Sequence, residues 1–307
     1  MELRWRLAGD HAQPTLFDPD DGVEPRRELP EVEYLHVYAR RLVNEVPKAS
    51  RMPFRYTINA YRGCSHACVY CFARPTHEYL GMDAGRDFER RIVVKVNAVE
   101  RVRAELAAPG WAGEHIAMGT NTDPYQRAEG RYRLTRGIVE VLAETRNPFS
   151  ILTKSSMIVR DADVLAAARR RTSVGVAFSV GTVDERVWRE TEPGTPPPAR
   201  RLEALRRLTE AGIPCSVLMA PILPGISDSP EQIRATVRAC RAAGAVSITP
   251  ITLHLRRGVR EQFMPWLAAA RPELVEHYEG VYAKAYAPAE VSKRITQLVR
   301  EADANAS

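Results

Sequence analysis

Three cysteines, Cys64, Cys68 and Cys71, lie close together in the spacing C-x3-C-x2-C. Three thiolates arranged this way can bind three irons of a cubane iron–sulfur cluster, whose usual protein ligands are four cysteines. The fourth iron is then left without a protein ligand, and an open position on a metal is where a substrate or cofactor binds in catalytic sites. The spacing therefore predicts a reactive cluster.

A structural zinc ion is the alternative occupant of these cysteines, and it takes four Cys or His ligands. His66 lies inside the loop and is either a fourth ligand or an ordinary loop residue that lines the cluster. Two further cysteines, Cys215 and Cys240, are each isolated in sequence. Because no convincing fourth ligand accompanies the motif, its spacing favours an iron–sulfur cluster over zinc.

The composition is that of an ordinary globular protein: 307 residues, 45% hydrophobic and 27% charged. The sequence has no apolar run of transmembrane length, and its first residues lack the apolar region of a signal peptide, so we expect a cytoplasmic protein without a membrane partner. Clustered cysteines in such a chain favour metal binding over disulfides. The net charge of +6 permits a polyanionic partner without requiring one.

Six apolar runs of strand length alternate with helix-like stretches. The predicted strands cover residues 54–59, 115–120, 149–153, 173–180, 214–221 and 246–252, and the predicted helices cover residues 91–107, 134–145, 161–170, 199–211 and 230–243. This alternation is typical of a parallel α/β sheet with crossover helices. Since six units are fewer than the eight of a closed barrel, we expect an open, partial (β/α)6 barrel of the TIM type.

Capping residues mark the ends of several predicted helices. Asp161 and Ser229 are predicted N-caps, and Pro230 suits a first helical position. Gly212 and Gly244 follow the last helical residues of two others, where a left-handed backbone is common.

Three regions are expected along the chain. Residues 1–50 form an N-terminal extension, with a turn-rich acidic segment at 18–25 and a weak helical pattern at 31–46. Residues 51–257 form the barrel. Residues 258–307 form a helical C-terminal region, with helical segments predicted at 261–270, 273–286 and 289–302.

Polar side chains follow several predicted strands at their carboxyl ends, the face on which barrels of this type build active sites. Lys154 ends the third strand and either extends to solvent or pairs with an anion, of which we favour the anion. Thr122 follows the second strand and Ser179 ends the fourth; each is either a ligand contact or a capping hydroxyl. Asp123 is interpreted as a cap of the turn before Pro124.

The segment from His254 to Trp266 follows the sixth strand and concentrates arginines and aromatic residues. Arginines there could contact phosphates, and the aromatic rings could stack on bases. Equally, the segment could be a loop that opens a helix and packs on the barrel, with its charges in water. Both interpretations stay open on the sequence alone.

A cysteine loop of this spacing after the first strand of a six-unit array resembles the radical SAM superfamily. The resemblance to the branch of spore photoproduct lyase and DNA-repair photolyase-like proteins rests on four further runs: Asn59-Ala-Tyr-Arg-Gly-Cys64, Asp123-Pro-Tyr-Gln126, Leu152-Thr-Lys-Ser155 and Trp188-Arg-Glu-Thr-Glu-Pro193. It extends over residues 57–267 and implies a radical SAM enzyme.

The resemblance also implies two cofactors. A [4Fe–4S] cluster would be bound by Cys64, Cys68 and Cys71, and S-adenosyl-L-methionine would chelate the open iron. Reductive cleavage of this cofactor would yield a 5′-deoxyadenosyl radical that abstracts hydrogen from an unidentified substrate, with nucleic acid as one candidate. The implied partner is an electron donor of the flavodoxin or ferredoxin type.

Individual residues are implied as cofactor contacts by the same resemblance. Lys154 resembles the lysine that contacts the carboxylate of S-adenosyl-L-methionine. Thr122 matches a small hydroxyl residue that contacts this cofactor in the lyase, and Ser179 would contact its ribose or methionine part. Tyr70, between the second and third cysteines, would pack near the adenine or simply cover the cluster.

Two positions depart from the lyase. The lyase carries a cysteine at the end of its second strand that returns hydrogen to the product radical, and Thr120 stands there in this chain. The lyase also carries a tyrosine after its third cluster cysteine, where this chain has Phe72. Cys215 and Cys240 are expected to be buried thiols away from the rim. The lyase's own reaction is therefore not expected, and a non-catalytic iron–sulfur redox sensor or nucleic-acid-binding protein is the alternative.

Overall fold

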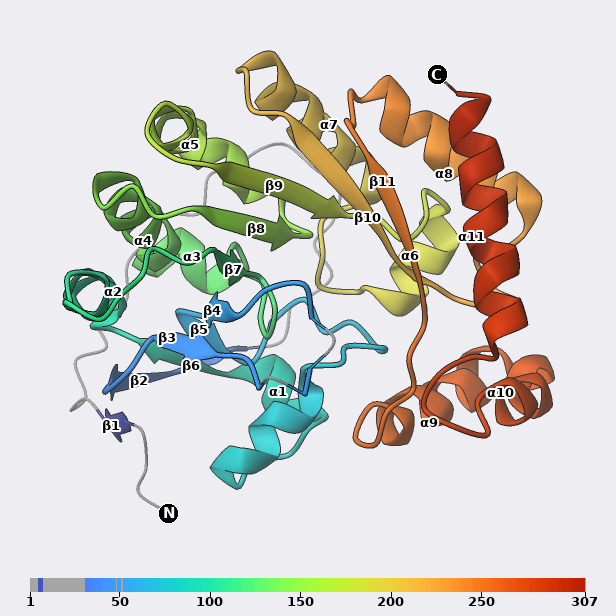
Figure 1. Cartoon of the computed structure of the whole chain (residues 1–307). Helices are drawn as coiled ribbons and strands as arrows, with labels where there is room; N and C mark the ends of the chain where they lie inside the picture. Colours follow the sequence, from blue (N-terminus) through green and yellow to red (C-terminus); the bar gives the residue numbers. More distant parts are fainter. Residues whose placement is uncertain (1–4, 8–30, 48, 51, 307) are drawn as a thin grey trace.

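The computed structural model describes residues 5–7, 31–47, 49–50 and 52–306, and Figure 1 shows their arrangement. The main sheet has the strand order β11-β10-β9-β8-β7-β4-β3. These strands are β3 (Val43–Glu45), β4 (Tyr56–Ile58), β7 (Ile116–Met118), β8 (Phe149–Thr153), β9 (Val174–Ser179), β10 (Cys215–Ile222) and β11 (Ile248–Thr252). Neighbours from β4 to β11 pair in parallel, and β3 pairs antiparallel with β4. Because β3 and β11 are separate edges, the predicted six parallel strands of an open barrel are confirmed.

Helices on the outer side of this sheet cover its strands (Figure 1). The helices between strands are α2 (Ala98–Leu106), α4 (Leu134–Glu144), α5 (Ala162–Arg169), α7 (Pro198–Glu210) and α8 (Pro230–Ala242). Ser229 caps α8 through its side chain, and Gly212 and Gly244 have positive φ, as predicted. Asp161 stands at the N-cap position of α5 but makes no capping hydrogen bond, because its carboxylate binds two arginines instead.

Two predictions for the N-terminal half are wrong. The residues at 31–46 form strands, β2 (Glu33–Ala39) and β3, and the predicted helix at 91–107 begins with a strand, β6 (Arg91–Lys95). A second sheet of order β1-β2-β6-β5 joins these to β1 (Trp5–Leu7) and β5 (Tyr61–Arg62). The β-branched run at 92–94 is buried, which favours a strand over a helix. The turn-rich segment at 18–25 lies outside the described residues.

The C-terminal region is helical, as predicted. It contains α9 (Arg260–Ala270), the short 3-10 helix η3 (Pro272–Leu274), α10 (Val275–Val281) and α11 (Ala289–Ala304). The helix predicted at 273–286 is therefore too long, since Tyr286 instead forms an isolated antiparallel bridge with His254. Phe263, Tyr278 and other buried residues of this region share one apolar cluster with Cys68. The C-terminal helices consequently pack against the cysteine loop.

Several short helices were not predicted. They are η1 (Arg74–Leu80), α1 (Arg86–Arg90), α3 (Arg127–Tyr132), η2 (Ser156–Asp161) and α6 (Glu185–Thr191). Each is shorter than the two to three turns over which an apolar periodicity can be read. In the part of the chain that the structure describes, no helix combines the length and the apolar character needed to cross a membrane.

Candidate active site

The cysteine loop begins where β5 ends. Gly63 has φ of +81°, and a Cβ there would lie 2.9 Å from the Phe88 carbonyl oxygen, so only glycine lets the chain turn at this point. Cys64 N–H donates to the same carbonyl oxygen at 2.8 Å. Cys64 and Cys68 are buried and Cys71 is half-buried, in contact with the apolar clusters of both other cysteines. The three thiols are therefore neighbours in space as well as in sequence.

Burial controls the chemistry of these thiols. It raises the pKa of Cys64 to about 12, with Asp123 and the neighbouring Cys71 adding to the effect. Burial likewise raises the pKa values of Cys68 and Cys71. The thiols are thus protonated without metal, and binding of iron would have to release their protons.

The donor set suits a cluster better than a single ion. Among the described residues, no three His, Cys, Asp or Glu side chains converge in a way that could hold one metal ion. A zinc ion needs its ligands to converge on one point about 2.3 Å from each sulfur. A cubane cluster makes no such demand, because each thiolate binds a different iron. Three free thiols on one loop fit a [4Fe–4S] cluster with one iron open.

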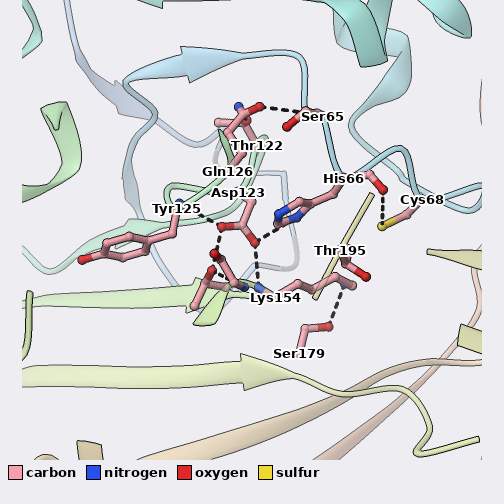
Figure 2. A network of polar contacts seen from close by, with 12 residues as sticks. Ser65, His66, Cys68, Thr122, Asp123, Tyr125, Gln126, Lys154, Ser179 and Thr195 are labelled. Atoms are coloured by element: carbon pink, nitrogen blue, oxygen red, sulfur yellow. Dashed lines mark hydrogen bonds and ion pairs between the residues drawn. The ribbon is translucent and has the colours of Figure 1, made fainter. Parts of the chain in front are cut away.

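The turn after β7 supports the cysteine loop through side-chain amide and hydroxyl groups (Figure 2). Thr122 Oγ1 donates to the Gly63 carbonyl oxygen at 2.6 Å, and Gln126 Nε2 donates to the same oxygen at 2.9 Å. Ser65 N–H in turn donates to Gln126 Oε1 at 3.0 Å. The structure thus gives Thr122 a role in supporting the loop, and Gln126 is a supporting residue that sequence reasoning missed.

Asp123 connects the ends of two strands to the loop. It accepts hydrogen bonds from Tyr125 N–H at 2.9 Å, which is the predicted turn cap, and from Lys154 N–H at 2.7 Å. It also accepts from Thr153 Oγ1 at 2.6 Å and lies 3.4 Å from His66 Nδ1. Burial lowers the pKa of His66, and Asp123 offsets this only in part, so the imidazole is neutral. His66 therefore lines the loop beside Asp123.

Lys154 and Ser179 meet because of strand register. Thr153 of β8 pairs with Phe178 of β9, so the next residues of these parallel strands lie side by side on the opposite face of the sheet from the helices. Lys154 Nζ donates to Ser179 Oγ at 2.8 Å and lies 5.7 Å from the centre of the Tyr70 ring (Figure 2). The structure therefore brings a cation, a hydroxyl and an aromatic ring together beside the cysteines.

Three charged residues near the loop were missed by sequence reasoning. The Tyr70 hydroxyl donates to Glu192, which forms a buried ion pair with Arg201. The buried Arg74 donates from Nε and Nη2 to the Cys68 carbonyl oxygen at 3.1 and 2.9 Å. Glu192 lies within a run noted for its resemblance, but nothing in sequence separates a buried carboxylate from an exposed one in such a short helix.

The remaining residues singled out in the sequence lie apart from this group. Phe72 is 59% exposed, so its ring points to solvent beside the loop. Cys215 on β10 and Cys240 on α8 are fully buried in the core between sheet and helices, as predicted. Neither thiol is therefore available at the rim.

Replacing Gly194 by alanine tests how tightly the loop is packed. A Cβ at Gly194 would lie 2.2 Å from the Ser65 carbonyl oxygen, so the backbone of the cysteine loop would have to shift. Overpacking of this kind costs about 1–3 kcal/mol. We expect a melting temperature lower by roughly 2–10 °C, and a lower iron content after reconstitution.

Gly110→Ala is the matched control, since nothing lies within 4 Å of a Cβ at Gly110. Iron content and melting temperature measured side by side decide the result. Equal values for Gly194→Ala and the control would show that this packing does not matter for the loop.

Comparison with known proteins identifies the family. The family model of the radical SAM superfamily matches residues 58–244. An uncharacterized protein of Mycobacterium tuberculosis is 47% identical over 253 residues, which are 82% of this chain and 74% of that protein. An uncharacterized protein of Methanocaldococcus jannaschii is 28% identical over 199 residues, which are 64% of this chain and 70% of that protein.

The fold has a solved counterpart. Spore photoproduct lyase complexed with dinucleoside spore photoproduct has a TM-score of 0.65 and 19% sequence identity, covering 91% of this chain and 84% of that chain. The architecture and the three-cysteine loop define a class of enzyme built on a partial TIM barrel. The chain belongs to the radical SAM superfamily.

Proposed function

We propose that the protein binds a [4Fe–4S] cluster through the three cysteines of its loop and S-adenosyl-L-methionine beside that cluster. The observation that supports this most directly is the meeting of Lys154 and Ser179 next to Tyr70 of the loop. When bound, these cofactors supply a 5′-deoxyadenosyl radical, through one-electron cleavage of S-adenosyl-L-methionine, for abstraction of hydrogen from a substrate.

The chain's own residues would bind and orient the cofactor. Lys154 would place its ammonium group against the cofactor carboxylate as a charge-assisted hydrogen bond. Ser179 would offer a polar contact and Tyr70 an apolar face. Thr122 Oγ1 already donates to the Gly63 carbonyl oxygen and accepts from Gln126, so at most one lone pair is free to accept from the cofactor.

The electron for this reaction must come from outside the chain. We propose a donor of the flavodoxin or ferredoxin type that approaches the loop near Cys71. Support comes from exposure: Cys71 is the least buried of the three cysteines, and the neighbouring Phe72 is 59% exposed.

Release of 5′-deoxyadenosine tests the enzymatic function. Protein reconstituted anaerobically with iron and sulfide is mixed with S-adenosyl-L-methionine and dithionite, and the products are separated by chromatography. We expect 5′-deoxyadenosine and methionine in equal amounts. A fully loaded cluster that leaves the cofactor intact, and whose EPR signal does not respond to it, would instead support the redox sensor.

We further propose that the substrate is a nucleic acid. The solved relative of the same fold is complexed with a dinucleoside photoproduct. In this chain, Tyr286 is 49% exposed, with the His254 ring 4.6 Å from its centre and the Arg256 guanidinium 5.3 Å from it. An arginine beside an exposed ring offers a phosphate contact together with a surface on which a base can stack.

The rest of the segment from His254 to Trp266 serves packing. Arg260 Nη1 donates to the Tyr282 carbonyl oxygen at 2.7 Å, and Phe263 is fully buried against Trp266 and Tyr278. Both interpretations of this segment are therefore supported, each for a different part of it.

Salt-dependent binding tests the proposed substrate class. Fluorescence anisotropy with a labelled single-stranded oligonucleotide is measured over a series of salt concentrations. We expect Arg256→Ala to weaken binding and to reduce the salt slope by about 1, the value for one lost phosphate contact. Arg238→Ala, an exposed arginine on α8, is the matched control. Identical slopes for both variants, or no binding at all, would refute this part of the proposal.

A further inference from the structure

The buried pair of Glu192 and Arg201 lies between the cysteine loop and the strand ends. Glu192 is 5% exposed and Arg201 is 1% exposed. Charges are buried at high cost unless they are paired and hydrogen-bonded, and such pairs are therefore placed where their geometry matters. The two residues belong to the connection between α6 and α7 and to α7 itself. No role in the proposed function has yet been assigned to them.

On one side, the pair contacts the cysteine loop. Glu192 accepts a hydrogen bond from the hydroxyl of Tyr70, the residue between the second and third cysteines. Backbone hydrogen bonds join the same two segments: Val69 N–H donates to the Thr191 carbonyl oxygen at 3.0 Å, and Gly194 N–H donates to the His66 carbonyl oxygen at 3.1 Å. The ion pair is thus part of a continuous contact along the loop.

On the other side, the pair contacts the end of β9. Arg201 Nη1 donates to the Ser179 carbonyl oxygen at 3.0 Å, and Ser179 Oγ accepts from Lys154 Nζ at 2.8 Å. Lys154 Nζ lies over the Tyr70 ring, which closes the circuit. Burial acts to raise the pKa of Glu192, but Arg201 and Lys154 outweigh it and keep that pKa below its usual range. Glu192 is therefore a carboxylate that balances both cations.

We propose that Glu192 is a positioning residue for the cofactor site. It orients Tyr70 directly and, through Arg201, orients Ser179 and Lys154, so that the cysteine loop and the strand ends present one fixed surface to the cofactor. This inference rests on the proposed function, because it assigns Glu192 to the same site. Glu192→Gln keeps the size of the side chain but leaves Arg201 and Lys154 without their counter-charge.

The test measures cofactor affinity separately from cluster content and from turnover. S-adenosyl-L-methionine is titrated into cluster-loaded protein while the EPR signal of the reduced cluster is followed. For Glu192→Gln we expect an affinity lower by roughly tenfold or more, the range for hydrogen bonds to charged groups. Glu190→Gln is the matched control, since Glu190 lies on α6 with its carboxylate on Arg186 and Arg271 instead. An affinity equal to that of the control would overturn the proposal.

A double-mutant cycle separates positioning from general destabilisation. If Glu192 acts through Lys154, adding Lys154→Met to Glu192→Gln will cost less affinity than it does in the wild type. Additive losses would show that the two residues act independently and would overturn the proposal. Should Glu192→Gln fail to load a cluster, Tyr70→Phe replaces it, since this removes only the hydroxyl that Glu192 binds. Unchanged affinity in Tyr70→Phe would then decide against it.

The outcome for the wild type keeps this inference distinct from the proposed function. Loaded wild-type protein that does not bind the cofactor at all would refute the function, whatever the variants do. Wild-type protein and Glu190→Gln that bind the cofactor, together with a Glu192→Gln variant that binds equally well, would refute only the role of Glu192.

Discussion

Cys71→Ala is expected to lose the cluster and the cleavage of S-adenosyl-L-methionine together. Cys71 contacts the apolar clusters of both other cysteines, so its thiolate is one of three that must bind iron at once. Two thiolates leave half of a cubane without protein ligands, and these clusters are normally bound by four cysteines. We expect an iron content near zero and 5′-deoxyadenosine formation lower by at least about a thousandfold, a loss of roughly 4 kcal/mol.

The measurement combines iron and sulfide analysis, the charge-transfer absorbance of the cluster and product chromatography. Cys240→Ala is the matched control, because it removes a buried thiol on α8 that faces the core. It should keep the cluster and the activity while melting at a lower temperature. Full iron loading in Cys71→Ala would show that another residue is a ligand and would refute the proposed site.

Lys154→Ala is expected to keep the cluster and to lose affinity for the cofactor. The ammonium group is placed at the strand end by register with β9, beside Ser179 and the Tyr70 ring. A hydrogen bond between two charged groups contributes about 1.5–3 kcal/mol, which corresponds to a dissociation constant raised roughly 10- to 150-fold. Iron content should stay at the wild-type level, because Lys154 is not a cluster ligand.

The affinity of Lys154→Ala is measured by the response of the cluster EPR signal to added cofactor. Lys284→Ala removes an exposed lysine of the C-terminal region and is the control for loss of one positive charge. A wild-type dissociation constant in Lys154→Ala would exclude the assigned contact with the cofactor carboxylate. Loss of the cluster in this variant would assign Lys154 to loop support instead.

The barrel could be predicted from sequence because its signals are local and repeated. Strand β8 coincides with the predicted residues 149–153, and the α8 helix follows its cap at Ser229. The errors occur where pairing partners distant in sequence decide the structure. The residues at 91–95 form a strand because β2 lies beside them in a parallel register, and no window of the local sequence contains that partner.

The site divides in the same way. The sequence alone determined which side chains can bind a cluster, since C-x3-C-x2-C is a local spacing, and it indicated Lys154 and Ser179 as polar residues at strand ends. Only the tertiary structure decided which residues support them. Glu192, Arg201, Gln126 and Arg74 meet the cysteine loop because strand register and loop packing bring together segments far apart in the chain. Burial of a charge depends on these long-range contacts, and a linear sequence does not contain them.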